Sequence, residues 1–212
     1  MHLLFDLDGT LTNPEAGITA CIRHALHELQ VPVPAAAELL QWIGPPLRDS
    51  FLTVCETPAQ ANRAVQLYRD RFATVGLYEN QVYEGVPSML LALQQQGHTL
   101  WVCTSKPQIF AQKIVQHFQL APYFAGVYGS ELNGDRAHKA ALIAHVLNHA
   151  SVRPEAAVMT GDRHYDIEGA RQNAVRAIGV TWGFGTATEL KIAGADALCL
   201  SPADFPTVLA TV

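Results

Sequence analysis

The feature of the sequence that most constrains its fold is an alternation of short apolar runs with longer segments of helical periodicity. Runs that are apolar throughout predict strands buried on both faces, and strands that alternate with helices form parallel sheets covered on both sides. The sequence therefore predicts an α/β fold with a doubly wound parallel sheet. The expected strands are 3–5, 99–104, 126–129, 156–160, 175–180 and 197–200, and the expected helices are 86–96, 107–118, 137–150 and 166–173.

A block between the first two strands has a different pattern. No strand signal occurs from residue 15 to about residue 80, and apolar residues there recur at three- and four-residue steps. We therefore expect an inserted all-helical domain over 15–80 and an α/β core formed by 1–14 together with 81–212. The helices expected in the insertion are 18–29, 38–43, 48–54 and 59–75.

Composition limits the class of protein. Hydrophobic residues make up 49% and charged residues 16% of the 212 positions, which is typical of a soluble globular protein. The net charge of −5 argues against a nucleic acid or an acidic membrane surface as partner, because no basic surplus exists to neutralise phosphates. No apolar run approaches the roughly 20 residues of a membrane span, and the first strand leaves no room for a signal peptide. We expect a cytoplasmic protein.

Two carboxylates follow the first strand with one residue between them, in the stretch Asp6-Leu7-Asp8-Gly9-Thr10. Side chains two apart on a strand point the same way, so the two carboxylates would lie close together and repel each other. A cation or a shared proton would relieve that repulsion, and carboxylate oxygens are ligands that Mg²⁺ prefers. An Asp-Gly pair after an apolar run is also a common turn, so this stretch alone leaves both interpretations open.

Polar residues also follow two later strands of the expected sheet. Thr104, Ser105 and Lys106 come after one strand, and Asp162 comes after another. Sites in doubly wound sheets form where the carboxyl ends of the strands meet. We therefore expect these residues to share one edge of the sheet with Asp6.

Taken together, these stretches resemble the four ordered motifs of the haloacid dehalogenase superfamily phosphatases, and the helical insertion resembles the alpha-helical cap of that family. The matching residues are Asp6-Leu7-Asp8-Gly9-Thr10, Thr104, Lys139 and Gly161-Asp162-Arg163-His164-Tyr165-Asp166. The resemblance implies a HAD-like Rossmannoid core and a Mg²⁺-dependent phosphatase that acts through an aspartyl-phosphate intermediate.

The resemblance also implies roles for the acidic residues. Asp6 would be the nucleophile, and Asp8 would protonate the leaving oxygen and later deprotonate the attacking water. Asp6, Asp8 through its backbone carbonyl, and Asp162 would hold Mg²⁺. Asp166 would either ligate the metal through water or only cap its helix, and both interpretations stay open.

The remaining candidates would contact phosphate or substrate. Thr104 and Lys139 are expected to stabilise the transferring phosphoryl group, although Thr104 could only cap a helix and Lys139 could be an ordinary exposed lysine. Weaker candidates for contacts with phosphate or substrate are Gly9, Thr10, Ser105, Lys106 and Arg48.

The substrate implied by the resemblance is a small phosphorylated metabolite. The loop Ile43–Phe51, together with the stretches Thr104–Pro107 and Thr181–Gly185, looks like phosphoglycolate phosphatases first and closely related 5′-nucleotidases second. Arg48 in that loop could pair with a substrate carboxylate or phosphate, or could be a surface charge. A β-phosphoglucomutase-like mutase and a non-catalytic binding protein are less favoured. The sequence leaves open whether the protein is a monomer or a homodimer.

Overall fold

The structure is a computed structural model that describes residues 1–212. Its main sheet has six strands in the order β5-β4-β1-β6-β7-β8, and every neighbouring pair is parallel. The predicted α/β class with a parallel sheet is confirmed. The strands are β1 (His2–Phe5), β4 (Thr99–Pro107), β5 (Gly126–Ser130), β6 (Ala157–Gly161), β7 (Arg176–Val180) and β8 (Ala197–Cys199).

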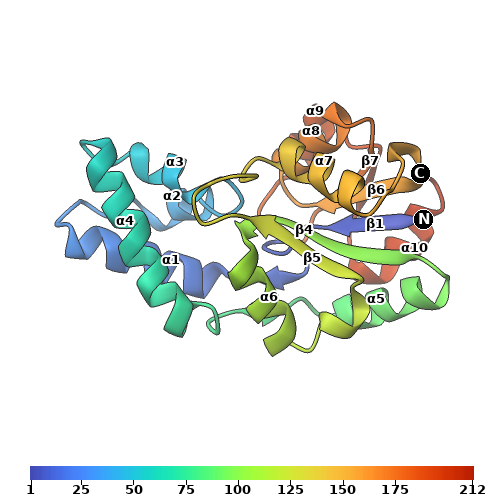
Figure 1. Ribbon diagram of the computed structural model, residues 1–212, viewed down its shortest axis with the longest axis horizontal. Coiled ribbons are helices and arrows are strands. Elements are labelled where there is room, and N and C mark those ends of the chain that lie inside the picture. The colour runs from blue at the N-terminus through green and yellow to red at the C-terminus, as the bar shows by residue number, and fades with distance from the viewer. The chain divides into compact units, whose positions relative to one another are not determined.

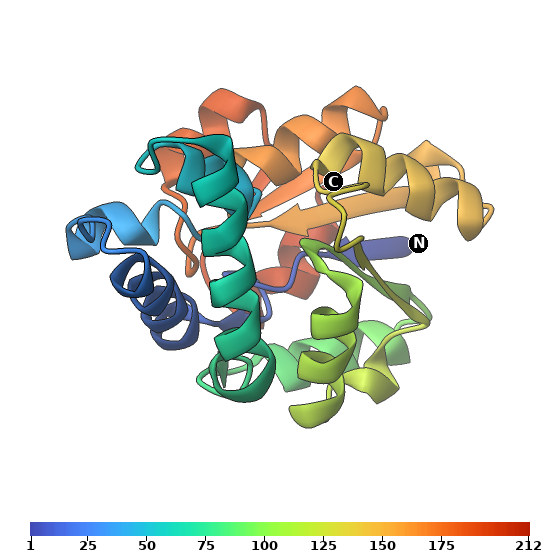
Figure 2. The same cartoon turned by 60° about the vertical axis from the view of Figure 1, so that its left-hand side comes forward.

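Helices cover both faces of this sheet, so its strands can be apolar throughout (Figure 1). One face carries α7 (Lys139–His149), α8 (His164–Gln172) and α9 (Ala187–Ala193). The other face carries α5 (Val86–Gln95), α6 (Gln108–His117) and α10 (Phe205–Leu209). The same two helical layers are visible on either side of the sheet in the turned view (Figure 2). Short 3₁₀ turns connect some of these elements, namely η2 (Ala121–Tyr123), η3 (Pro154–Ala156) and η4 (Pro202–Asp204).

The first strand lies in the middle of the sheet and is completely buried over Leu3–Phe5. Phe5 is in register with Val102 of β4 on one side and with Thr160 of β6 on the other. The residues that follow β1 therefore emerge between the carboxyl ends of β4 and β6. This arrangement places the first acidic stretch between the two later polar stretches.

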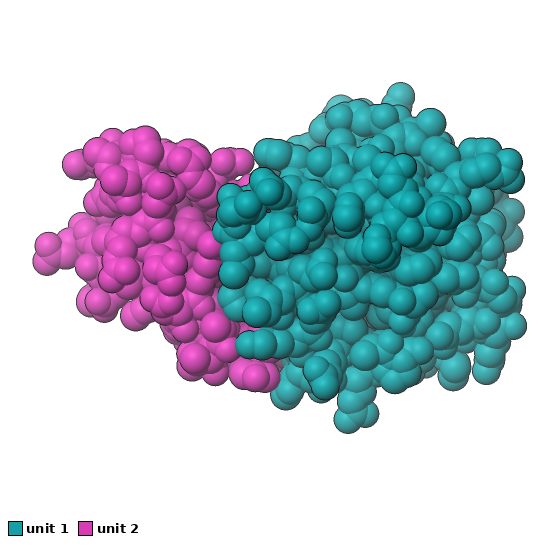
Figure 3. Space-filling view, in the orientation of Figure 1, with its two compact units in different colours: residues 1–13, 82–212 teal, residues 14–81 magenta.

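The chain divides into two compact units, one formed by residues 1–13 with 82–212 and the other by residues 14–81 (Figure 3). Apart from Gln81, the regular structure of the second unit is helical. Arg71 lies 2.8 Å from Glu79 and donates to the Cys21 sulfur at 3.0 Å, which ties the two ends of this unit together. Its elements are α1 (Glu15–Glu28), α2 (Ala36–Leu40), α3 (Leu47–Leu52), α4 (Pro58–Arg71) and the π-helical turn η1 (Phe72–Gly76).

Some element boundaries differ from the predicted ones. β4 runs to Pro107, because its pairing with β5 resumes there after an irregularity that begins at Thr104. α8 begins at His164 rather than at residue 166. The Asp166 carboxylate, in the first turn of this helix, accepts the Arg163 N–H at 3.1 Å and so caps the N-terminus of the helix. Two short strands that the sequence did not indicate, β2 (Thr12–Asn13) and β3 (Gln81–Val82), pair with each other. No helix in the chain combines the length and the apolar character needed to cross a bilayer.

Candidate active site

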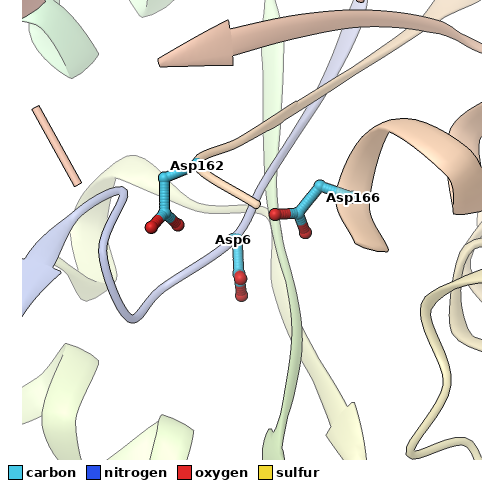
Figure 4. A group of neighbouring side chains, drawn as sticks. All are labelled: Asp6, Asp162 and Asp166. Carbon is cyan, nitrogen blue, oxygen red and sulfur yellow. The ribbon is translucent and has the colours of Figure 1, made fainter. Parts of the chain in front are cut away.

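Three carboxylates meet at the edge of the sheet where β1 and β6 end (Figure 4). Asp6 follows β1, Asp162 follows β6, and Asp166 lies in the first turn of α8. All three side chains are buried, and one carboxylate oxygen of each lies within 4.8 Å of those of the others. Buried negative charges this close repel each other, so the group requires compensating positive charge or protons.

Lys139, the first residue of α7, supplies one positive charge to this carboxylate group. Its ammonium nitrogen lies 2.9 Å from Asp6 Oδ1 and 2.7 Å from Asp166 Oδ1, and it donates to the Cys103 carbonyl at 2.7 Å. Burial alone would lower the pKa of Lys139, but the carboxylates of Asp166 and Asp6 outweigh it and hold that pKa above its ordinary value. The side chain is buried and charged, so the alternative of an exposed surface lysine is wrong.

Asp162 has no ion-pair partner among the residues of the chain. The Thr10 hydroxyl donates to its Oδ1 at 3.2 Å, and the Phe184 N–H donates to its Oδ2 at 2.8 Å. Burial, reinforced by the charges of Asp166 and Asp6, raises the pKa of Asp162 to about 8. The surroundings of this carboxylate therefore favour a bound proton or a bound cation.

The carboxylate group fits Mg²⁺ by its charge and by its donor atoms. Lys139 balances only part of the negative charge of Asp6, Asp162 and Asp166, so a divalent cation would supply the missing positive charge. The ligands offered are carboxylate oxygens, which a small hard cation prefers over nitrogen or sulfur. The Asp8 carboxylate lies outside this group, and the sequence predicted a contact of Asp8 with the metal only through its backbone carbonyl. A contact through its backbone carbonyl stays a prediction.

Asp8 pairs with a lysine of its own. Lys106 Nζ donates to Asp8 Oδ2 at 2.6 Å, and both side chains are largely buried. Burial raises the pKa of Asp8 above its ordinary value, although the neighbouring Lys106 charge acts in the opposite direction. A carboxyl group that keeps its proton nearer to neutral pH suits general acid catalysis.

The residues predicted to contact phosphate form hydrogen bonds within the protein. Thr104 is buried at this edge of the sheet, and its hydroxyl accepts the Lys106 N–H at 3.3 Å. The Gly9 N–H donates to the Thr12 carbonyl within the turn, and the Ser105 carbonyl accepts from the Ser130 hydroxyl. Contacts of Gly9, Thr10, Thr104 and Ser105 with phosphate therefore stay predictions.

Arg48 lies outside the unit that carries the carboxylates. It is an exposed residue of the 14–81 unit, and its Nε donates to Asn62 Oδ1 at 2.8 Å. A substrate contact of Arg48 stays a prediction.

Two groups of the site come from segments distant in the sequence, and the sequence did not indicate either of them. Glu189 of α9 accepts from the Arg163 Nε at 2.9 Å and from the His164 N–H at 3.0 Å, which fixes the turn before α8. Burial would raise the pKa of Glu189, but these hydrogen bonds outweigh it and hold the pKa at about 2. The second contribution is the Phe184 N–H on Asp162. A backbone amide leaves no signal in the sequence, and the only signal of Glu189 is its place in the first turn of a helix.

Comparison with known proteins agrees with this geometry. The sequence pattern of the haloacid dehalogenase-like hydrolases matches residues 3–180. A 5′-nucleotidase of Pseudomonas aeruginosa is 48% identical over 191 residues, which cover 90% of this chain and 86% of that protein. A phosphoglycolate phosphatase of Agrobacterium fabrum is 29% identical over 191 residues, which cover 85% of this chain and 80% of that protein.

Solved structures give the same result. The crystal structure of a predicted phosphatase from Clostridium acetobutylicum superposes with a TM-score of 0.94 at 37% identity, covering 100% of this chain and 98% of that one. The match to the family extends over most of the chain, and the related proteins named above are phosphatases or nucleotidases. The chain therefore belongs to the haloacid dehalogenase-like hydrolases and, within them, to the phosphatases.

Proposed function

We propose that the protein is a Mg²⁺-dependent phosphomonoester hydrolase in which Asp6 carries the phosphoryl group as an aspartyl-phosphate. The observation that carries this proposal is the position of Asp6, which is a buried carboxylate held by Lys139 and grouped with Asp162 and Asp166. Asp6 Oδ1 is engaged twice, since it accepts the Leu7 N–H at 2.7 Å and lies 2.9 Å from Lys139 Nζ. We assign Oδ2 as the attacking oxygen for this reason.

The proposed reaction has two steps. In the first, Asp6 Oδ2 forms a bond to phosphorus while the ester oxygen leaves with its electron pair and takes the proton of Asp8. In the second, the Asp8 carboxylate removes a proton from water, the water oxygen bonds to phosphorus, and the Asp6 carboxylate leaves. The products are the alcohol and inorganic phosphate, and Asp8 is again protonated.

The other residues of the site stabilise charge during both steps. Lys139 fixes the Asp6 carboxylate and keeps a positive charge beside the reacting oxygen. The Thr104 hydroxyl, at the end of the neighbouring strand, is our candidate for a contact with a phosphoryl oxygen. Mg²⁺, when bound by Asp6, Asp162 and Asp166, supplies further positive charge to neutralise the phosphate.

We propose nucleoside 5′-monophosphates as the first substrate class to test. The support is the 48% identity to a protein named 5′-nucleotidase, whereas the phosphoglycolate phosphatase is 29% identical. This reverses the order expected from the sequence alone. Phosphoglycolate remains the second candidate because the ammonium group of Lys106, buried beside Asp8, suits a leaving group that carries a carboxylate close to its ester oxygen.

Hydrolysis of p-nitrophenyl phosphate tests the reaction class. We expect p-nitrophenol to be released with Mg²⁺ and not with excess EDTA. The metal would neutralise much of the negative charge that opposes attack of a carboxylate on a phosphate. Restoring Mg²⁺ should restore the rate. A rate that is the same with Mg²⁺ and with EDTA would contradict the proposed function.

A kinetic panel of natural phosphomonoesters tests the substrate class. The compounds are nucleoside 5′-monophosphates, phosphoglycolate, sugar phosphates and pyrophosphate, compared by kcat/KM at one Mg²⁺ concentration. We expect the highest value for a nucleoside 5′-monophosphate. A higher value for phosphoglycolate would overturn this choice and return the order to that expected from the sequence.

Lys106 is expected to assist Asp8. We expect Lys106→Gln to lower kcat for a nucleoside monophosphate about tenfold or more, because a positioned acid–base group contributes roughly 10²–10⁴-fold and Asp8 would lose its partner. The matched control is Lys113→Gln, an exposed lysine of α6. Equal kcat values for both variants would show that the ion pair with Asp8 does not contribute to the reaction.

A further inference from the structure

The loop between β7 and α9 contacts two parts of the site, although it contributes no carboxylate. It runs through Thr181-Trp182-Gly183-Phe184-Gly185 and lies next to both Asp162 and the turn that follows Asp8. The proposed reaction does not use any of its side chains. Its contacts nevertheless reach the one carboxylate of the group that has no ion-pair partner in the chain.

The first contact fixes the orientation of the Asp162 carboxylate. The Phe184 N–H donates to Oδ2 at 2.8 Å, while the Thr10 hydroxyl donates to Oδ1 at 3.2 Å. The two donors come from segments far apart in the sequence, and each binds a different oxygen. With both oxygens held in this way, the plane of the carboxylate is defined without any metal.

The second contact ties the loop to the segment that carries Thr10. The indole N–H of Trp182 donates to the Thr10 carbonyl at 3.0 Å. Thr10 thus donates to Asp162 through its hydroxyl and accepts from the loop through its backbone. Asp162, Thr10 and the loop therefore form a closed set of contacts in which each member contacts the other two.

The third observation is the closeness of the backbones. A Cβ atom at Gly183 would lie 2.2 Å from the Gly9 carbonyl oxygen and 2.5 Å from the Asp162 side chain. A Cβ atom at Gly185 would lie 1.8 Å from the Asp162 carbonyl oxygen. The nearest neighbour at each position is a backbone carbonyl oxygen, which cannot rotate away, so the two positions accept only glycine without a shift of Asp162 or of the turn.

We propose that the Trp182–Gly185 loop is a positioning element that sets the Mg²⁺ affinity of the site by holding Asp162 and the Gly9–Thr10 turn in place. The inference rests on the proposed function for the identity of the metal. Groups that orient a metal ligand without touching the metal commonly change its affinity about 10–100-fold when they are removed. The loop therefore acts on metal binding, whereas the residues around Asp6 act on the chemical steps.

The test compares two tryptophan variants that each lose one indole hydrogen bond. Trp182→Phe removes the contact with Thr10, and the control Trp101→Phe removes a bond of 3.2 Å from another half-buried indole to His2 at the start of β1. Mg²⁺ binding to each protein without substrate is measured by calorimetry and by the Mg²⁺ concentration that half-saturates the rise in unfolding temperature. We expect Trp182→Phe to weaken Mg²⁺ binding about tenfold and Trp101→Phe to leave it unchanged.

A kinetic measurement separates positioning from general damage. With Trp182→Phe, kcat at saturating Mg²⁺ should approach the wild-type value, while the Mg²⁺ concentration for half-maximal activity should rise about tenfold. Gly183→Ala should weaken Mg²⁺ binding further, provided that circular dichroism shows a folded protein. If that variant does not fold, Trp182→Phe decides alone.

The outcomes distinguish this inference from the proposed function. Mg²⁺ affinities of Trp182→Phe and wild type that agree within error would overturn the role of the loop and leave the proposed function intact. A wild-type protein that shows no Mg²⁺ binding and no Mg²⁺-dependent activity would overturn both. A loss of kcat in Trp182→Phe with unchanged Mg²⁺ affinity would also contradict the inference, since the loop would then act on the chemistry.

Discussion

Asp6→Asn is expected to lower kcat for phosphomonoester hydrolysis by at least about a thousandfold while the protein remains folded. The amide has the shape of the carboxylate, but it is a far weaker nucleophile and cannot form the acyl phosphate. It removes the ion pair with Lys139 but also relieves charge repulsion with Asp162 and Asp166, and Lys139 keeps Asp166 as a partner, so little net loss of stability is expected. The measurement is kcat for p-nitrophenyl phosphate at saturating Mg²⁺, together with the unfolding temperature.

The control for this variant is Asp204→Asn, an exposed aspartate of the same unit. It should retain the wild-type kcat, because a surface carboxylate outside the site does not affect the reaction. If Asp6→Asn kept more than about a tenth of the wild-type kcat, a thousandfold loss would be excluded and Asp6 would not be the nucleophile.

Asp162→Asn is expected to have opposite effects on function and on stability. It should abolish detectable Mg²⁺ binding, because one of the three proposed carboxylate ligands is lost, and it should raise the stability of the metal-free protein. The asparagine oxygen can still accept the Phe184 N–H, and the asparagine nitrogen can donate to the Thr10 hydroxyl oxygen, which reverses the direction of that hydrogen bond. What disappears is a buried carboxyl group that has no cationic partner in the chain, and that must either hold a proton or carry an uncompensated charge.

The pH dependence of the metal-free protein follows from the same residue. The pKa of Asp162 is about 8 in the folded protein against an ordinary value of 3.8, so the folded state binds this proton more tightly than the unfolded state. The bound proton stabilises the folded protein fully when the pH is below the ordinary pKa of 3.8. This stabilisation is lost as the pH rises through the folded-state pKa of about 8. In EDTA, the wild-type protein should therefore lose stability between about pH 5.5 and about pH 8 by roughly 3 kcal/mol more than Asp162→Asn.

Denaturant unfolding in EDTA at both pH values measures this difference. Asp204→Asn again serves as the control and should follow the wild-type protein. Identical pH dependence in wild type and Asp162→Asn would show that the Asp162 carboxylate carries no buried charge. A less stable metal-free Asp162→Asn at the higher pH would contradict the repulsion between the three carboxylates.

The sequence predicted the fold well because the relevant signals are local. Apolar runs such as Leu3–Phe5 and Ala157–Met159 are buried strands, and parallel pairing forces their carboxyl ends to one edge. The positions of Asp6 and Asp162 near each other follow from that rule. The proximity of Asp166 to Asp162 was also predictable, because Asp166 lies only four residues further along the chain, in the first turn of α8.

The contacts that organise the site were less accessible to sequence reasoning. The pairing of Lys106 with Asp8 depends on β4 continuing past Thr104, and that extension depends on where the neighbouring strand β5 lies. The contact of the Phe184 amide with Asp162 involves backbone atoms, which every residue carries. In each case the contact depends on how one segment packs against another. The residue pattern within a single segment therefore cannot predict the contact.

The central claim, that Asp6 carries the phosphoryl group, is tested most directly by mass analysis of Asp8→Asn quenched in acid during reaction with p-nitrophenyl phosphate. The p-nitrophenolate leaves without a proton from Asp8, whereas water needs Asp8 as its base, so the intermediate should accumulate in this variant. We predict one added phosphoryl group per molecule, located on Asp6 by fragmentation, and none in protein that also carries Asp6→Asn. A phosphoryl group on another residue, or no phosphoryl group and no burst of p-nitrophenolate, would contradict the account.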